Sequence, residues 1–257
     1  MRITSLLLGA AVLASPAAMQ AQLVDLELSL LVDVSGSITS TEFELQRQGY
    51  ADAFASDSLQ SAILSTANDR IGAIAVNLIF WAGAAQQAEV VGWTLLDSAA
   101  AIDDFAMAIA AAPRTYPSRG QTAIGDALAF ATPLFETNSF TSARQVIDIS
   151  GDGATNDGSD TAAARDATLA AGVESINGII ILGEDGLQDF YTNNVVGGSG
   201  HFLRTATGFD TFGDAIADKL EFEISGAVPE PATYGAIGAA VLLGLALWRR
   251  RSANIPA

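Results

Sequence analysis

The sequence contains no cysteine and only one histidine, His201, in 257 residues. The absence of cysteine excludes disulfide bonds, thiol redox chemistry and thiolate metal sites, so the fold depends on its hydrophobic core. A histidine-based metal site or catalytic triad would depend on His201 alone. This residue lies in a glycine-rich stretch that we expect to be a loop, and no G-x-S-x-G motif accompanies it. We therefore expect that the protein is not an enzyme.

Basic residues are also scarce. The chain has 12 Lys and Arg against 29 Asp and Glu, which gives a formal net charge of −17. Such an acidic surface repels the phosphates of nucleic acids and anionic lipids, and it favours divalent cations nearby. The glycine-rich segment also lacks the G-K-[ST] sequence of a P-loop. We expect no nucleic-acid partner.

The amino-terminal segment has the composition of an export signal. Arg2 is followed by an apolar run over residues 3–13, and small residues then extend to Ala21. This is the order of regions in a secretory signal peptide. The apolar run is too short to cross a hydrocarbon core of about 30 Å. Residues 1–21 are therefore predicted to be a signal peptide, and the mature protein to be exported.

The carboxyl-terminal segment, 227–257, carries a second signal. Pro229-Glu230-Pro231 precedes an apolar stretch that is just long enough to form a transmembrane helix over 232–248, and three arginines follow it. This tripartite pattern resembles the PEP-CTERM sorting signal of Gram-negative bacteria. The resemblance implies transient anchoring in the inner membrane, cleavage by an exosortase-type protease, and release to the outer surface, the periplasm or an exopolysaccharide matrix.

Between these ends, residues 22–226 alternate predicted strands with predicted helices. Strands are predicted at 24–34, 71–81, 90–95, 145–150 and 176–182, with a short edge strand at 202–204. Helices are predicted at 40–57, 98–112, 124–135, 160–171 and 211–222. This alternation predicts one α/β domain with a doubly wound, mainly parallel sheet and helices on both faces. Ligands of such sheets bind beyond the carboxyl ends of the strands.

The loop after the first of these strands reads Asp33-Val34-Ser35-Gly36-Ser37. Its carboxylate and two hydroxyls, at i, i+2 and i+4, can converge on one point. They are hard oxygen ligands suited to Mg²⁺, Mn²⁺ or Ca²⁺. The pattern alone is weak, because short polar loops often produce it by chance. Its place at the end of a buried strand strengthens it, as do two later loops that present Thr122 and Asp152.

Together the three loops resemble the metal-ion-dependent adhesion site of von Willebrand A domains: D-x-S-x-S, then a G-x-T loop, then D-G after a later strand. The resemblance implies five metal-site residues, Asp33, Ser35, Ser37, Thr122 and Asp152. In that family the hydroxyls contact the metal directly, the aspartates bind directly or through water, and a vacant position accepts a carboxylate from the partner. The arrangement fits Mg²⁺ ahead of Mn²⁺ or Ca²⁺.

Three longer stretches, RQVIDISGDGATNDG, FWAGAAQQAEVVGWTL and NNVVGGSGHF, resemble an uncharacterised secreted bacterial subgroup of A-domain proteins. This similarity extends over residues 24–226. It supports the von Willebrand A-like fold class for the whole exported domain.

Ordinary structural roles stay open for these residues and their neighbours. Ser35 and Ser37 could cap a helix or satisfy turn amides, and Asp152 could be a turn residue. Asp126 fits the first turn of a helix, and Asp148 could be paired in the core.

Asn156 and Asp157, just beyond Asp152, either border the site or are loop residues that face solvent. Trp81 and Trp93 lie in or beside predicted strands, and we expect them in the core.

The resulting hypothesis is an exported, metal-dependent protein-binding or adhesion module. Its bound cation would ligate a carboxylate of a protein partner or an acidic exopolysaccharide. Two alternatives remain open. The chain could be an assembly factor for an envelope or metalloenzyme complex, or a structural matrix protein whose metal site only stabilises the fold.

Overall fold

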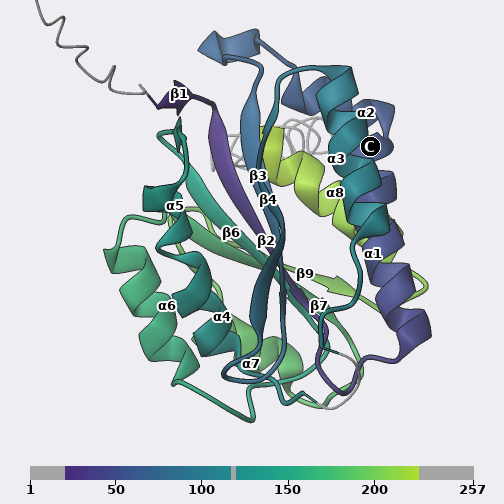
Figure 1. The fold of residues 1–257 in the computed structure, drawn as a ribbon. Coiled ribbons are helices and arrows are strands. Elements are labelled where there is room, and N and C mark those ends of the chain that lie inside the picture. The colour runs from purple at the N-terminus through teal and green to yellow at the C-terminus, as the bar shows by residue number, and fades with distance from the viewer. Residues whose placement is uncertain (1–20, 117–119, 226–257) are drawn as a thin grey trace, which may run out of the picture.

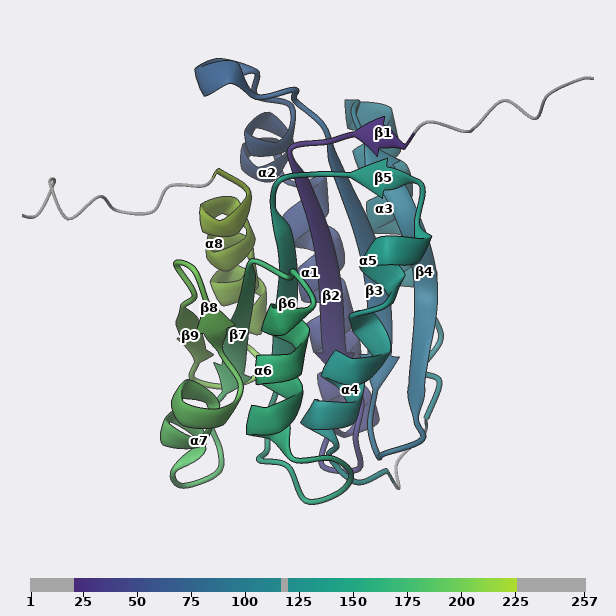
Figure 2. The same cartoon turned by 90° about the vertical axis from the view of Figure 1, so that its left-hand side faces the viewer.

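The computed structural model describes residues 21–116 and 120–225, and a central sheet there separates two layers of helices (Figures 1 and 2). The predicted signal peptide, except Ala21, lies outside the described residues. The predicted sorting segment 227–257 and its transmembrane helix at 232–248 also lie outside them. Within the described ranges, no helix is long and apolar enough to cross a membrane.

The main sheet has seven strands in the order β4-β3-β2-β6-β7-β8, and β9 also pairs with β7. Their bounds are β2 (Leu26–Asp33), β3 (Ile74–Trp81), β4 (Gln87–Leu96), β6 (Gln145–Gly151), β7 (Ser175–Ile181), β8 (Gly197–Gly198) and β9 (Leu203–Ala206). The pairs are parallel except β3 with β4 and β7 with β8. The prediction of a mainly parallel α/β sheet is confirmed.

Strand β4 runs antiparallel because its connection to β3 is short. Only residues 82–86 separate the two strands, which leaves no room for a crossover helix. The Ala82 amide donates to the Gln86 carbonyl at 2.9 Å and closes a hairpin. A separate small parallel pair joins β1 (Gln22–Leu23) to β5 (Phe140–Thr141).

The helices divide between the two faces of the sheet (Figure 1). One face is covered by α1 (Ser40–Ala55), α2 (Asp57–Ile63), α3 (Ala99–Ala111) and α8 (Phe212–Ser225). The other is covered by α4 (Ile124–Ala131), α5 (Leu134–Thr137), α6 (Thr161–Ala170) and α7 (Leu187–Asn194). A short 3₁₀ turn, η1 (Ala67–Asp69), follows α2.

Strand β2 is at the centre of both cores. Leu28, Leu30 and Val32 pack into the core beneath α1, whereas Leu31 packs into the core beneath α4. Every residue of β2 is buried.

A strand covered on both faces favours a continuous apolar run, which β2 has at residues 30–32. The first half of β2 alternates, and the buried Glu27 there accepts hydrogen bonds from Asn138 and Ser142.

Two local sequence features set helix ends. Helix α1 begins at Ser40 because Thr39 and Glu42 form a capping box, in which the Glu42 carboxylate accepts from the Thr39 amide at 2.7 Å. The helix predicted at 124–135 is divided into α4 and α5. Pro133 lies between them, and proline cannot donate the backbone hydrogen bond that would continue α4.

The order of the strands creates a ligand-binding position. Strand β2 lies between β3 and β6, so the chain leaves β2 toward one side of the sheet and reaches β6 on the other. The carboxyl ends of β2 and β6 therefore lie side by side, and the loops that leave them diverge. Such switch points are where open α/β sheets bind ligands.

Candidate metal site

The loops after β2 and β6 bring the two predicted aspartates together. Asp33 is the last residue of β2, and Asp152 directly follows β6. The two strands pair in parallel, with Val32 opposite Ser150. The parallel register therefore brings both side chains to the same end of the sheet.

All five predicted site residues are linked by hydrogen bonds. The Ser35 amide donates to Asp33 Oδ1 at 2.7 Å, and the hydroxyls of Ser35 and Ser37 are 3.2 Å apart. Ser37 Oγ donates to Asp152 Oδ1 at 2.7 Å, and Thr122 Oγ1 donates to Ser35 Oγ at 3.4 Å. The structure thus gathers three hydroxyls and two carboxylates, from three loops, in one place.

One oxygen of this group has no partner. Asp33 is fully buried, and its Oδ2 atom accepts no hydrogen bond. A buried acceptor without a partner is unfavourable by about 1–3 kcal/mol, and more when the group is charged. The orphan oxygen therefore marks a position where a cation or another donor would stabilise the fold.

The electrostatics of the two carboxylates favour a cation. Burial, followed by the charge of Asp152, raises the pKa of Asp33 to about 7, although hydrogen bonds from Ser35 oppose the rise. Burial also raises the pKa of Asp152, with smaller contributions from the charges of Glu42 and Glu184. A divalent cation between the aspartates would balance both charges.

The donor set fits a hard divalent ion. In residues 21–116 and 120–225, no group of three or more His, Cys, Asp or Glu side chains lies close enough to hold a metal. The site instead combines two carboxylates with three hydroxyls, which suits Mg²⁺ because this ion keeps waters and needs few protein charges. Asp33, Ser35, Ser37, Thr122 and Asp152 would hold the ion, which would act as a Lewis acid toward a ligand carboxylate.

Arg114 holds the loop that carries the two serines. Its guanidinium donates to the carbonyls of Val34 (2.9 Å), Ser35 (2.9 Å) and Ile38 (2.7 Å). No motif in the sequence points to Arg114. It is one of two arginines, with Arg119, between a predicted helix and Gly120, and its position next to Pro113 was the available signal.

The Thr122 loop is held by residues whose role the sequence left open. Asn156 Oδ1 accepts from the Thr122 amide at 2.9 Å, and Asp157 accepts from the Ala84 amide at 3.0 Å. Asp126 accepts from the Ser159 amide at 2.6 Å. Asn156 also lines the cavity beside the site, so it borders the site although it is exposed to solvent.

Gly151 and Tyr191 lie beneath the aspartates. A Cβ atom on Gly151 would collide with the Tyr191 hydroxyl and would lie 3.2 Å from Asp33 Oδ2. The Tyr191 hydroxyl is buried and has no hydrogen-bond partner in the structure. Only glycine fits at this end of β6 without displacing one of the two side chains. No motif in the sequence points to either Gly151 or Tyr191.

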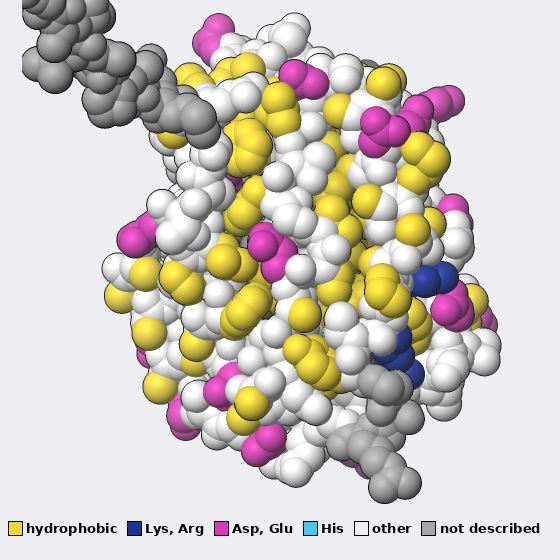
Figure 3. All heavy atoms as spheres, viewed as in Figure 1, with side chains coloured by type: hydrophobic (Ala, Val, Ile, Leu, Met, Phe, Trp, Pro, Cys, Tyr) yellow, Lys and Arg dark blue, Asp and Glu magenta, His cyan; other side chains and the backbone are white. Residues whose placement is uncertain are grey.

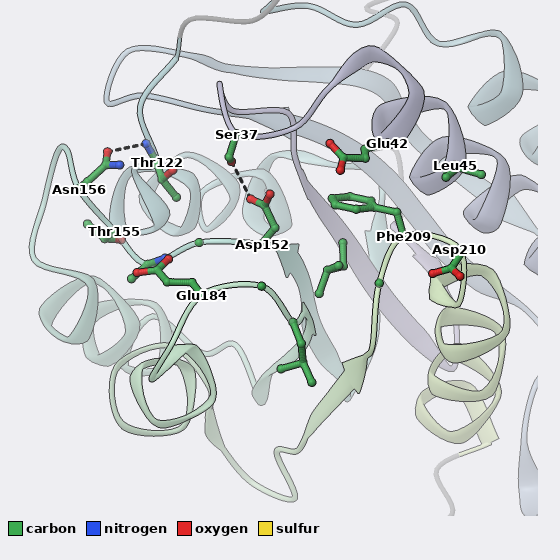
Figure 4. Close-up of a pocket in the computed structure, with 16 residues that line it drawn as sticks. Ser37, Glu42, Leu45, Thr122, Asp152, Thr155, Asn156, Glu184, Phe209 and Asp210 are labelled. Carbon is green, nitrogen blue, oxygen red and sulfur yellow. Dashed lines mark hydrogen bonds between the residues drawn. The ribbon is translucent and has the colours of Figure 1, made fainter.

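A cavity of about 800 Å³ opens beside the site (Figure 4). Ser37, Thr122 and Asp152 line it, together with apolar and acidic side chains from α1, from the end of β7 and from the loop before α8. Figure 4 shows Ser37 and Asp152 joined by their hydrogen bond within this cavity. The cavity places Ser37, Thr122 and Asp152 within reach of a macromolecular ligand, whereas Asp33 and Ser35 are fully buried behind them.

Other residues considered from the sequence lie elsewhere. Asp148 forms an interior ion pair with Lys219 at 2.7 Å and is not part of the site. His201 is exposed, and its Nδ1 lies 2.8 Å from the Gly198 carbonyl oxygen. Trp81 is fully buried, as expected for a core residue, whereas Trp93 is only partly buried and packs against Phe135 at the edge of the core.

The fold defines a von Willebrand A-like domain. The chain belongs to the family described as "Protein of unknown function (DUF1194)", whose pattern it matches over residues 23–228. Residues 227–251 match the PEP-CTERM protein-sorting motif. This motif marks an exported protein that is recognised by an exosortase-type sorting system and is transiently anchored at the membrane.

Solved structures of similar fold come from diverse sources. The pilus adhesin SpaC from Lactobacillus rhamnosus GG is 15% identical, with a TM-score of 0.57 over 80% of this chain and 31% of that chain. Proximal thread matrix protein 1 from the mussel byssus is 18% identical, with a TM-score of 0.54 over 80% of this chain and 47% of that chain.

A von Willebrand factor type A protein from Catenulispora acidiphila is 16% identical, with a TM-score of 0.50 over 79% of this chain and 42% of that chain. The chain thus spans less than half the length of each of these three proteins. At these identities the comparisons establish the fold alone. No curated protein matches the sequence.

Proposed function

We propose that the protein is an exported, metal-dependent adhesion module. A divalent cation, Mg²⁺ ahead of Mn²⁺ or Ca²⁺, binds to Asp33, Ser35, Ser37, Thr122 and Asp152, and it ligates a carboxylate of a partner. The protein acts at the cell surface or in the exopolysaccharide matrix of a Gram-negative bacterium. The observation that carries this proposal is the hydrogen-bonded network that joins the five residues, together with the buried Asp33 carboxylate, whose Oδ2 atom has no partner.

A binding role is favoured over catalysis. The single histidine contacts a backbone carbonyl, and no serine among residues 21–116 and 120–225 is hydrogen-bonded to it. The cavity beside the site is large enough for a segment of a macromolecule. A metal that served only as a folding staple would need no such opening.

Calorimetric titration of the full-length protein with Mg²⁺, Mn²⁺ and Ca²⁺ tests the metal site. We expect binding heat that disappears in Asp33→Asn, because the neutral amide cannot balance the cation. Asp104→Asn is the matched control, since Asp104 is exposed on α3. Absence of heat with all three ions would overturn the proposal.

Partner capture separates adhesion from the two alternatives. If Asp33→Asn lowers thermal stability but leaves capture intact and insensitive to EDTA, the metal only stabilises the fold. A metal-dependent complex with an envelope or metalloenzyme assembly would instead support the assembly-factor alternative.

A further inference from the structure

The cavity beside the proposed metal site has an apolar wall. Leu45 on α1 and Leu182 after β7 are each 41% exposed, and Phe209 lies beside them, partly buried. Figure 4 shows the Phe209 ring on the side of the cavity opposite Thr122. Five large hydrophobic side chains are exposed in the described residues, and two of them are in this wall. Exposed apolar side chains that gather at one place mark an interaction surface.

The same cavity has an acidic rim. Glu42, Glu184 and Asp210 line it, and the described lining contains no Lys or Arg. Two of the three are held in place. The Glu184 carboxylate accepts from the Ala154 amide at 2.9 Å, and the Glu42 carboxylate is fixed by the capping box of α1.

This rim restricts what can approach the metal. A divalent cation would be balanced by Asp33 and Asp152, so the three rim carboxylates would remain uncompensated. A ligand that brought only carboxylates would gain one bond to the metal and be repelled by the rim. A ligand that placed a cationic group beside its carboxylate would be attracted at both positions.

We propose that the cavity receives a polypeptide segment in which one acidic residue lies beside a Lys or Arg and an apolar residue. The acidic residue would ligate the metal, the basic residue would pair with Glu184 or Asp210, and the apolar residue would pack against the wall formed by Leu45, Leu182 and Phe209. This inference rests on the proposed function. Of its two ligand classes, it selects protein over acidic polysaccharide, because a polyuronate repeats negative charge and offers neither a cation nor an apolar side chain.

Immobilised synthetic peptides provide the test, with full-length protein measured by biolayer interferometry in Mg²⁺ and in EDTA. The peptides share Gly-Ser flanks and differ only at the centre, which reads Leu-Glu-Lys, Leu-Glu-Glu, Ser-Glu-Lys or Leu-Gln-Lys. Oligogalacturonate represents the polysaccharide. We expect Leu-Glu-Lys to bind most tightly, Leu-Gln-Lys to lose binding, and EDTA to abolish the signal.

Rim variants identify the contact. Glu184→Gln keeps an acceptor for the Ala154 amide but removes the charge. Asp210→Asn removes the charge on the opposite side of the cavity. Each should reduce the preference for Leu-Glu-Lys over Leu-Glu-Glu by about two- to fivefold, the range for exposed charge pairs. Glu221→Gln and Asp104→Asn are the matched controls on exposed positions of α8 and α3.

The outcomes separate this inference from the proposed function. If all peptides that contain Glu bind equally and EDTA abolishes their binding, the adhesion function stands and the inference is wrong. Tighter binding of oligogalacturonate than of any peptide also overturns the inference, as does the absence of binding by every peptide. If the Glu and Gln peptides bind alike in the presence of EDTA, the metal-dependent function fails, and the inference fails with it.

Discussion

A buried cluster of three charges leads to an unusual prediction for stability. Lys219 Nζ lies 2.7 Å from Asp148 Oδ1 and 3.1 Å from each carboxylate oxygen of Glu223, and none of the three residues is more than 1% exposed. Two carboxylates therefore share one ammonium. Burial, supported by the charge of Asp148, raises the pKa of Glu223 from 4.5 to about 7 against the attraction of Lys219.

The direction of the pH effect follows from this shift. Between pH 4.5 and about 7, the unfolded chain has lost the Glu223 proton and the folded protein has kept it. The free energy of unfolding therefore falls as pH rises through this window. A shift of about 2.5 pKa units corresponds to about 3 kcal/mol, and the side chain is too buried for solvent to screen this contribution.

Replacement of Glu223 by Gln removes the titrating group and keeps its shape. As pH rises from about 4.5 to about 8, the wild type should lose the contribution of Glu223 and Glu223→Gln should not. We therefore expect the free energy of unfolding of Glu223→Gln to rise by about 3 kcal/mol relative to that of the wild type over this range. Urea unfolding at both pH values, in saturating Mg²⁺ so that Asp33 contributes equally to both proteins, measures the difference. Glu221→Gln, an exposed position on the same helix, should show no such gain. Parallel curves for wild type and Glu223→Gln would show that Glu223 is ionised throughout in the folded protein, and the reasoning would be wrong.

Three further predictions concern the metal site. Gly151→Ala should lower the free energy of unfolding by roughly 1–3 kcal/mol and abolish the calorimetric heat of Mg²⁺ binding, because its Cβ would displace Tyr191 or Asp33. Gly92→Ala, where a Cβ meets nothing within 4 Å, is the control, and equal effects at both glycines would contradict the prediction. Arg114→Met should weaken Mg²⁺ binding, measured by calorimetry, and lower the free energy of unfolding in urea by about 1–3 kcal/mol, because three carbonyls lose their donor. Unchanged Mg²⁺ affinity would show that the loop keeps its shape without Arg114. Tyr191→Phe should leave the free energy of unfolding in urea unchanged or raise it by up to about 1 kcal/mol, since the buried hydroxyl has no hydrogen-bond partner. A clear loss of stability would show that the hydroxyl has a partner.

The strands were predictable because each long strand carries a strong local signal. The apolar runs at 30–32 in β2 and at 78–81 in β3 reflect burial on both faces, which favours apolar side chains at every position of the run. Helix α7 has no such signal. It has eight residues, of which only Leu187 and Tyr191 are buried, and so short a segment cannot show helical periodicity. The helix is held by packing against the sheet, which no local pattern reveals.

The residues of the candidate site were likewise predictable only where their signal lies within one short segment. Asp33, Ser35 and Ser37 lie in one short loop, so their spacing could be interpreted from the sequence. Arg114 could not be placed, because its contacts with that loop join residues 76 to 80 positions apart. The contact between Gly151 and Tyr191 likewise exists only after β6 and α7 have packed together.

Metal binding at the proposed site would be linked to fold stability whichever of the proposed functions is correct. The orphan Asp33 Oδ2 and the raised pKa values of Asp33 and Asp152 show that the folded chain without metal carries unfavourable buried charge. Any ion that binds the folded state alone must raise stability, by about 2.7 kcal/mol at a concentration of 100 Kd. A rise in stability with Mg²⁺ is therefore expected of an adhesion module and of a folding staple alike. Only metal-dependent capture of a ligand, lost in Asp33→Asn, distinguishes the two.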